Sequence, residues 1–151
     1  KLACYLKSTG GKGLHLVVPI EAELEWPAAK RFAHAVTLKM EAEQPALYIT
    51  KMSKAQRKGR IFLDYLRNDR EATSIAPYSP RARSGIPVAM PLAWKELESA
   101  TRPAFHVADI EQWRARLTHD PWKTMATAQQ RLTKEILCAA GAADAATSMR
   151  G

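Results

Sequence analysis

Residues 58–68 read KGRIFLDYLRN, a short apolar run that follows basic residues and contains one carboxylate. Its aromatic and branched side chains predict a strand over Ile61–Leu66. Alternation along a strand places Phe62, Asp64 and Leu66 on the same face. The run is therefore expected to present a carboxylate on an otherwise apolar face of a sheet.

Asp64 is the first candidate for a functional residue. A carboxylate among apolar side chains is expected to be partly buried and to need a cation, which is either an arginine or a metal ion. The local chemistry leaves two interpretations open. One is a structural ion pair with Arg67 or Arg81, and the other is a catalytic, metal-binding carboxylate.

The preceding part of the chain predicts a hairpin and a helix. Residues 2–7 and 14–20 have the pattern of strands, and the glycine-rich residues 8–13 are expected to form the turn between them. A helix is predicted to begin near Pro27, a favoured residue of the first turn, and to end at residues 44–45.

The following part of the chain becomes helical toward its end. Residues 73–78 are predicted to form a further strand and residues 79–91 a loop. The C-terminal segment, about 105–145, is expected to hold one helix over 107–117 and a final helix that begins at Met125. Strands followed by helices indicate an α+β fold, with a mixed, mostly antiparallel sheet and packed helices, in a single domain over 1–151.

Composition favours a polyanionic partner. The 151 residues include 23 basic and 15 acidic side chains, a net charge of +8, which suits nucleic acid or a membrane surface. No apolar run approaches the length needed to span a bilayer. Cys4 and Cys138 lack metal-ligand spacing and are expected to be reduced core residues of a cytoplasmic protein.

Much of this charge lies in residues 51–83, here called the basic segment. It contains nine basic and three acidic residues, a local charge of +6 around Asp64. Charge runs are usually solvated surface, but this one suits a triphosphate or a nucleic-acid backbone. Four residues at its start are candidates for DNA binding: Lys51, Lys54, Arg57 and Lys58.

The glycine-rich turn and the histidines carry weaker indications. The turn is either a plain hairpin or an anion-binding loop, because its glycines let the backbone approach a ligand. His15, beside the turn, is either a hydrogen-bonded core residue or a donor to phosphate or sugar. His34 is expected on a solvated helix face, and His106 and His119 have no evident partner.

Six ordered segments together resemble a known family. They are TGGKGLH (9–15), LVVPI (16–20), KGRIFLDYLRN (58–68), APYSPRAR (76–83), VAMPLAW (88–94) and DPW (120–122). They are similar to segments of the polymerase domain of bacterial DNA ligase D, within the archaeo-eukaryotic primase superfamily. The likeness covers nearly the whole chain.

The resemblance implies roles for individual residues. Asp64 matches the family's third metal-binding carboxylate, which with Mn²⁺ or Mg²⁺ supports two-metal nucleotidyl transfer. Thr9 and His15 match the motif that contacts the incoming nucleotide, and Arg67 and Arg81 match basic residues near its triphosphate. The family adds nucleotides to DNA ends during non-homologous end joining, prefers ribonucleoside triphosphates and manganese, and works beside Ku and a ligase module.

The sequence departs from the family in one respect. The Asp-x-Asp motif that supplies the other two carboxylates should precede the glycine-rich turn, but residues 1–8 contain no acidic residue. The alternating Glu21, Glu23 and Glu25 are expected on the surface. We expect a piece of a longer polymerase, because a strand pattern is present almost from Lys1. The alternatives are a catalytically inactive nucleotide- or DNA-binding module and, less compatible with the ordered motifs, a basic domain for another acidic partner.

Overall fold

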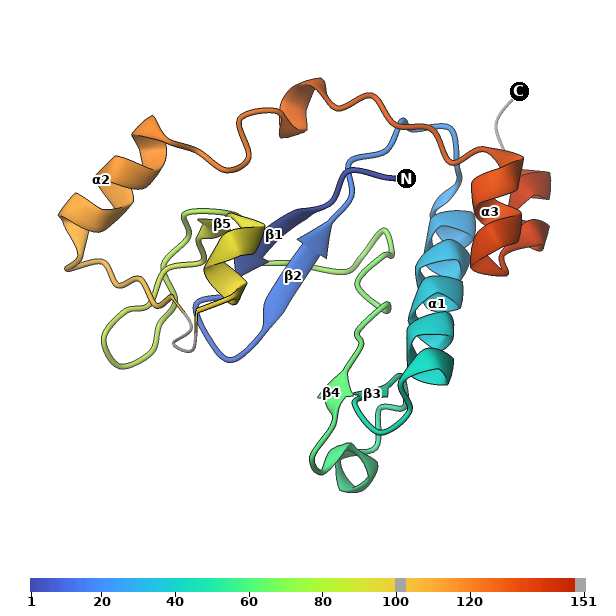
Figure 1. Ribbon diagram of the computed structural model, residues 1–151, viewed down its shortest axis with the longest axis horizontal. Helices are drawn as coiled ribbons and strands as arrows, with labels where there is room; N and C mark the ends of the chain where they lie inside the picture. The colour runs from blue at the N-terminus through green and yellow to red at the C-terminus, as the bar shows by residue number, and fades with distance from the viewer. Residues whose placement is uncertain (100–102, 149–151) are drawn as a thin grey trace. The chain divides into compact units, whose positions relative to one another are not determined.

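The computed structural model describes residues 1–99 and 103–148, and the chain divides into two compact units. Unit 1 consists of residues 1–20 and 75–130, and unit 2 consists of residues 21–74 and 131–151. Figure 1 shows the helices and strands of both units. The single domain expected over 1–151 stays a prediction.

Unit 1 is built on a three-stranded antiparallel sheet. Strands β1 (Tyr5–Ser8) and β2 (Leu14–Val17) form the predicted hairpin, and β5 (Pro91–Leu92) pairs with the other edge of β1 in the order β2-β1-β5. Both hairpin strands are shorter than predicted. The Gln130 side chain bonds the backbone of Ala3 and the carbonyl of Pro19, so these residues satisfy their polar groups outside the ladder.

One face of this sheet packs into an apolar core. Its buried members are Leu6, Val88, Met90, Leu92 and Phe105. Trp122 is also buried, and its indole donates a hydrogen bond to the carbonyl of Leu6 at 2.8 Å. Such a bond satisfies the polar edge of a large side chain inside the core. The predicted interruption at residues 120–122 is therefore a packing element of the sheet.

Short helices complete unit 1. They are the 3₁₀ helix η2 (Trp94–Leu97), the α-helix α2 (Ile110–Thr118) and the 3₁₀ helix η3 (Met125–Thr127). Helix α2 confirms the helix predicted within residues 107–117. In the described part of the chain, no helix is long and apolar enough to cross a membrane.

Unit 2 packs helices beside a two-stranded parallel sheet. Helix α1 (Trp26–Glu43) has Pro27 in its first turn, as predicted, and contacts helix α3 (Lys134–Ala140) and the 3₁₀ helix η4 (Ala143–Ser148). Strands β3 (Tyr48–Ile49) and β4 (Ile61–Phe62) pair in parallel and are joined through the 3₁₀ helix η1 (Lys54–Arg57). The mixed, mostly antiparallel α+β fold is confirmed.

Of two further predicted strands, the one over 61–66 is shorter than predicted and the one over 73–78 is absent. The strand expected over 61–66 ends at Phe62, although the amide of Leu63 still bonds the carbonyl of Ile49 at 2.9 Å. Beyond it the chain turns, because the Asp64 carboxylate accepts the amide of Leu66. The described residues 73–78 form no strand; the carbonyls of Thr73 and Ile75 accept hydrogen bonds from side chains in place of a neighbouring strand.

The final helix begins later than predicted. Residues 128–133 are not helical, and α3 begins at Lys134, where the Thr133 hydroxyl accepts the amide of Ile136 at 3.4 Å. Gly141, at φ 81°, ends it. Both cysteines are free, but Cys138 is exposed and Cys4 only half-buried, so the expected core positions are wrong for Cys138 and partly met for Cys4.

Candidate active site

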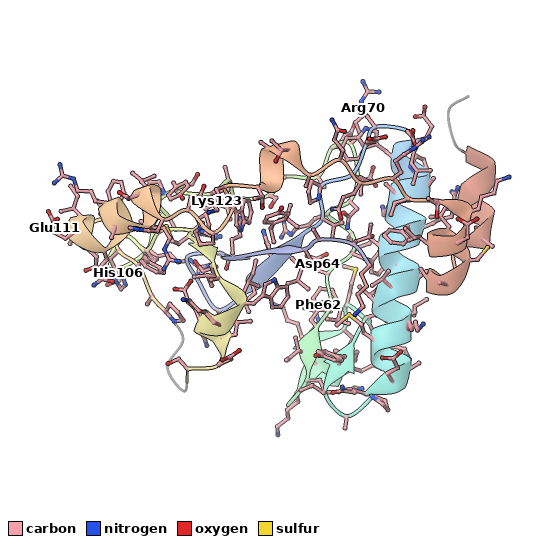
Figure 2. The ribbon with its side chains drawn as sticks, turned by 45° about the horizontal axis from the view of Figure 1, so that its top comes forward. Phe62, Asp64, Arg70, His106, Glu111 and Lys123 are labelled. Atoms are coloured by element: carbon pink, nitrogen blue, oxygen red, sulfur yellow. The ribbon has the colours of Figure 1, made fainter. Side chains whose placement is uncertain are left out.

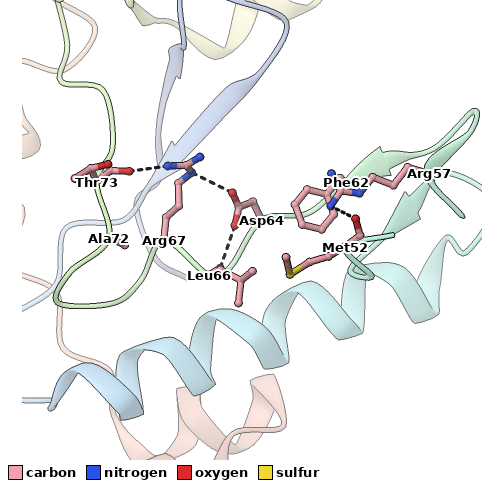
Figure 3. Close-up of a pocket in the computed structure, with 8 residues that line it drawn as sticks. All are labelled: Met52, Arg57, Phe62, Asp64, Leu66, Arg67, Ala72 and Thr73. Atoms are coloured by element: carbon pink, nitrogen blue, oxygen red, sulfur yellow. Dashed lines mark hydrogen bonds and ion pairs between the residues drawn. The ribbon is translucent and has the colours of Figure 1, made fainter. Parts of the chain in front are cut away.

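A pocket of about 320 Å³ opens in unit 2 around Asp64 (Figure 3). The eight residues that line it are Met52, Arg57, Phe62, Asp64, Leu66, Arg67, Ala72 and Thr73. Phe62, Asp64 and Leu66 all line the pocket, but Asp64 and Leu66 lie beyond the end of β4, so the strand face predicted from alternation is not formed. Asp64 is the one carboxylate in this lining, beside two arginines.

The Asp64 side chain is held by its own loop. One carboxylate oxygen accepts a hydrogen bond from the amide of Leu66 at 3.1 Å, and the other accepts one from Nε of Arg67 at 3.0 Å. Arg67 also donates to the carbonyl of Thr73 at 2.6 Å. The Asp64 side chain is 32% exposed, more open than expected, because the turn after β4 lifts it out of a regular sheet. The predicted ion pair with Arg67 is present.

Arg57 belongs to the same pocket. Its guanidinium carbon lies 3.6 Å from the centroid of the Phe62 ring, and Nη2 donates to the carbonyl of Met52 at 2.5 Å. A cation over an aromatic face is attracted by the ring quadrupole, which fixes the guanidinium beside the pocket. The other three candidate DNA-binding residues, Lys51, Lys54 and Lys58, are exposed.

The glycine-rich turn lies in unit 1, with Thr9 and Arg81 in contact. The Thr9 hydroxyl donates to the carbonyl of Gly13 at 3.0 Å, and Arg81 donates to the carbonyl of Thr9 at 3.3 Å. Gly10 has φ 62°, and a Cβ there would lie 3.0 Å from Cγ of Arg81. Only glycine fits this position without strain, so the close approach of the arginine depends on it.

Lys7 is an unpredicted buried cation beneath this turn. It is 2% exposed, and its ammonium donates to the carbonyl of Ile75. Burial, and next the charge of Arg81, lower the pKa of Lys7. His15 faces Lys7 across the hairpin register and is half-buried. Strand alternation alone gave no reason to expect a buried lysine.

Two other histidines differ from expectation. His34, predicted on a solvated face, is half-buried and stacks on Tyr65 with ring centroids 3.9 Å apart. His106, labelled in Figure 2, had no evident partner in the sequence but pairs through Nδ1 with Asp109 at 3.1 Å. The His106–Asp109 pair joins residues at i and i+3, a spacing that is visible in the sequence. The His34–Tyr65 stack joins residues far apart in the sequence, and no local pattern predicts it.

The described residues do not form a metal centre by themselves. Within 1–99 and 103–148, no three His, Cys, Asp or Glu side chains are grouped so that they could hold a metal ion. Glu21 and Glu23 are half-buried and pair with Arg131, at 3.5 Å and 2.6 Å. Asp64 could therefore supply one carboxylate ligand, while a two-metal centre would need others.

The predicted site residues lie in two places, the Asp64 pocket of unit 2 and the glycine-rich turn of unit 1. Residues 1–122 match the family model described as the LigD, primase-polymerase domain, and the chain belongs to this family.

Relatives agree with this assignment. The multifunctional non-homologous end joining protein LigD of Pseudomonas aeruginosa is 36% identical over 141 residues, which cover 87% of this chain and 16% of that protein. The bifunctional non-homologous end joining protein LigD of Bacillus subtilis is 30% identical over 109 residues, covering 72% of this chain and 18% of that protein. The chain thus spans less than a fifth of the length of these relatives.

A solved structure has the same fold. The polymerase domain from Mycobacterium tuberculosis ligase D, determined in complex with DNA, superimposes with a TM-score of 0.73 at 32% sequence identity. The match covers 80% of this chain and 41% of that chain. The resemblance drawn from the ordered motifs is confirmed.

Proposed function

We propose that this chain is part of a polymerase domain that transfers nucleotides to DNA 3′ ends during non-homologous end joining. The family match supports the proposal, as do the net charge of +8 and the relative that was solved with DNA. The observation that carries it is the Asp64 carboxylate in a pocket whose other charged side chains are Arg57 and Arg67. Such a pocket suits a phosphate group held next to a cation.

The arginines have a clear electrostatic task in this reaction. The DNA 3′-hydroxyl attacks the α-phosphorus of a nucleoside triphosphate, a new phosphodiester bond forms, and pyrophosphate leaves with the negative charge. Guanidinium groups fixed near the triphosphate stabilise that charge. Arg67 in unit 2 and Arg81 in unit 1 are proposed for this role, and Thr9 and His15 are proposed to contact the nucleotide.

A divalent ion, Mn²⁺ or Mg²⁺, would neutralise phosphate charge and activate the attacking hydroxyl when bound. The pocket supplies one carboxylate, and Arg67 already donates to it. One carboxylate does not hold two ions, so the residues that the structure describes do not fit a complete two-metal centre. Asp64 is proposed as one ligand in the complete protein, whose further carboxylates would come from residues outside this sequence.

The test is primer extension by the complete protein with ribonucleotides and Mn²⁺. Asp64→Asn keeps the size of the side chain and removes its charge, and we expect extension to fall by roughly a hundredfold or more. Glu71→Gln is the matched control, because Glu71 is an exposed carboxylate of the same loop that does not line the pocket. Equal activity of the two variants would refute the role of Asp64.

A binding module without chemistry is the second candidate function. It is favoured by the Asp64–Arg67 ion pair, which gives the carboxylate a structural partner. It predicts salt-dependent DNA binding that persists in Asp64→Asn and after removal of divalent ions. If the complete protein binds DNA but does not extend a primer under any of these conditions, this second function replaces the first.

A further inference from the structure

Residues 64–73, here called the Asp64 segment, have neither helical nor strand structure. The segment carries both Asp64 and Arg67. Its internal bonds are local, such as the amide and side chain of Asn68 donating to the carbonyl of Tyr65 at 3.2 Å and 2.9 Å. A loop without ladder hydrogen bonds needs contacts with a rigid element to hold a side chain in one place.

Helix α1 provides that element through two contacts on one of its faces. The His34 ring stacks on the Tyr65 ring, with centroids 3.9 Å apart and planes inclined by 16°. Lys30 pairs with Asp69 at 2.6 Å. Lys30 and His34 lie four residues apart, which places them on the same side of the helix. The two contacts therefore hold the segment at two points along the same face.

The stack is the contact that acts most directly on Asp64. Tyr65 follows Asp64 immediately, so fixing its ring fixes the backbone from which the carboxylate projects into the pocket. The Lys30–Asp69 pair is more solvated, with side chains 34% and 47% exposed, and ion pairs of this kind contribute little. Parallel aromatic rings at this distance give a directional contact that salt does not screen.

We propose that His34 is a positioning residue for Asp64, acting through its stack on Tyr65; this inference rests on the proposed function. The imidazole is used for its flat ring, and its nitrogens take no part in the role. Phenylalanine at this position preserves the contact, whereas alanine removes it. The sequence contains no sign of this role, because residues 34 and 65 belong to separate elements.

The test compares His34→Ala, His34→Phe and the control Lys39→Ala in the complete protein. Lys39 lies on the same helix, and its ammonium donates to the carbonyl of Ala139 at 3.3 Å. The first measurement is deuterium uptake of the peptide that covers residues 64–73. The second is the Mn²⁺ concentration that gives half-maximal primer extension, measured together with the KM for the nucleotide.

In His34→Ala we expect faster deuterium uptake in that peptide and a Mn²⁺ requirement raised about threefold to tenfold, in line with the loss of one aromatic pair. His34→Phe and Lys39→Ala should resemble the unchanged protein in both measurements. The proposal is overturned if His34→Ala matches Lys39→Ala in deuterium uptake, or if His34→Phe is as impaired as His34→Ala. If His34→Ala were too unstable to assay, a near-normal His34→Phe would still support the ring as the essential feature.

The two proposals fail separately. Full activity in Asp64→Asn would refute the catalytic role of Asp64, yet deuterium uptake would still show whether His34 orders the segment. Loss of activity in Asp64→Asn, with an unchanged Mn²⁺ requirement in His34→Ala, would leave the polymerase function intact and overturn the positioning role.

Discussion

The ion pair between Glu96 and Arg116 should make a large contribution to the stability of unit 1. Both carboxylate oxygens accept hydrogen bonds from the guanidinium at 2.6 Å, and the two side chains are only 21% and 14% exposed. The Glu96 carboxylate also accepts the amide of Ala93 at 2.7 Å. The pair joins η2 to α2.

Glu96→Gln is the perturbation with the least change in shape. It removes the charge and leaves Arg116 half-buried opposite a neutral amide. Breaking a buried pair by removing one partner costs about 3–5 kcal/mol, and a hydrogen bond to a charged group contributes about 1.5–3 kcal/mol. Because this pair is partly solvated and glutamine keeps one acceptor, we expect the free energy of unfolding to fall by about 2–3 kcal/mol at pH 7.

Urea unfolding followed by tryptophan fluorescence measures this change in the relevant unit. Trp94, Trp113 and Trp122 lie in unit 1, whereas Trp26 lies in unit 2. Glu98→Gln is the matched control, because Glu98 is an exposed carboxylate two residues away. Its effect should stay within about 0.5 kcal/mol.

The pH dependence gives an independent check. Hydrogen bonds from Arg116 hold the pKa of the Glu96 carboxyl below its usual value, and the Ala93 amide acts in the same direction, against the opposing effect of burial. A carboxyl whose pKa is lowered in the folded state stabilises it above its unfolded pKa, about 4.3, and loses that contribution as the pH falls through the folded pKa. The difference in the free energy of unfolding between the unchanged chain and Glu96→Gln should therefore be largest at pH 7 and become smaller below about pH 4. This reasoning would be refuted if the difference in the free energy of unfolding were as large at pH 2 as at pH 7. It would also be refuted if Glu96→Gln were as stable as Glu98→Gln at pH 7.

Two further predictions concern the turn and the basic residues. Gly10→Ala should destabilise unit 1 by more than about 2 kcal/mol, since strain at its φ of 62° is added to a Cβ 3.0 Å from Arg81. Gly141→Ala, with φ 81° and no described atom within 4 Å of the added Cβ, should cost only about 1 kcal/mol, and equal losses in urea unfolding would contradict the steric argument. Replacing Lys51, Lys54 and Lys58 by glutamine in the complete protein should reduce the salt slope of DNA binding by roughly 2–3. An unchanged slope in fluorescence anisotropy would exclude these lysines from the DNA contact.

The hairpin, helix α1 and the 120–122 interruption were predictable because their determinants are local. Glycines at a turn, a proline in the first turn of a helix and an Asp-Pro pair restrict the backbone wherever they occur. The same local chemistry singled out Asp64 as a carboxylate within an apolar run. These features need no knowledge of what packs against them.

The strands predicted over 61–66 and 73–78 were wrong because nearby side chains compete for hydrogen bonds with their backbone. A run such as IFLDYL has strand propensity throughout, but propensity is weaker than a side chain that offers a hydrogen bond at a turn. Asp64 supplies that bond to Leu66, and Arg67 supplies one to Thr73. Asp64, the candidate metal ligand, is therefore also the residue whose side chain ends the strand.

The ion pair at Asp64 is weak enough for the carboxylate to exchange Arg67 for another cation. The Arg67 side chain is 54% exposed and the Asp64 side chain 32%, and an exposed pair of this kind contributes at most about 1 kcal/mol. That is too little to prevent the carboxylate from binding a stronger cation. Arg67 can also leave Asp64 while keeping its bond to the carbonyl of Thr73, and so remain in the pocket. The pair is thus compatible with a site in which the carboxylate binds a cation and the guanidinium binds a phosphate, which is the arrangement that Asp64→Asn would test.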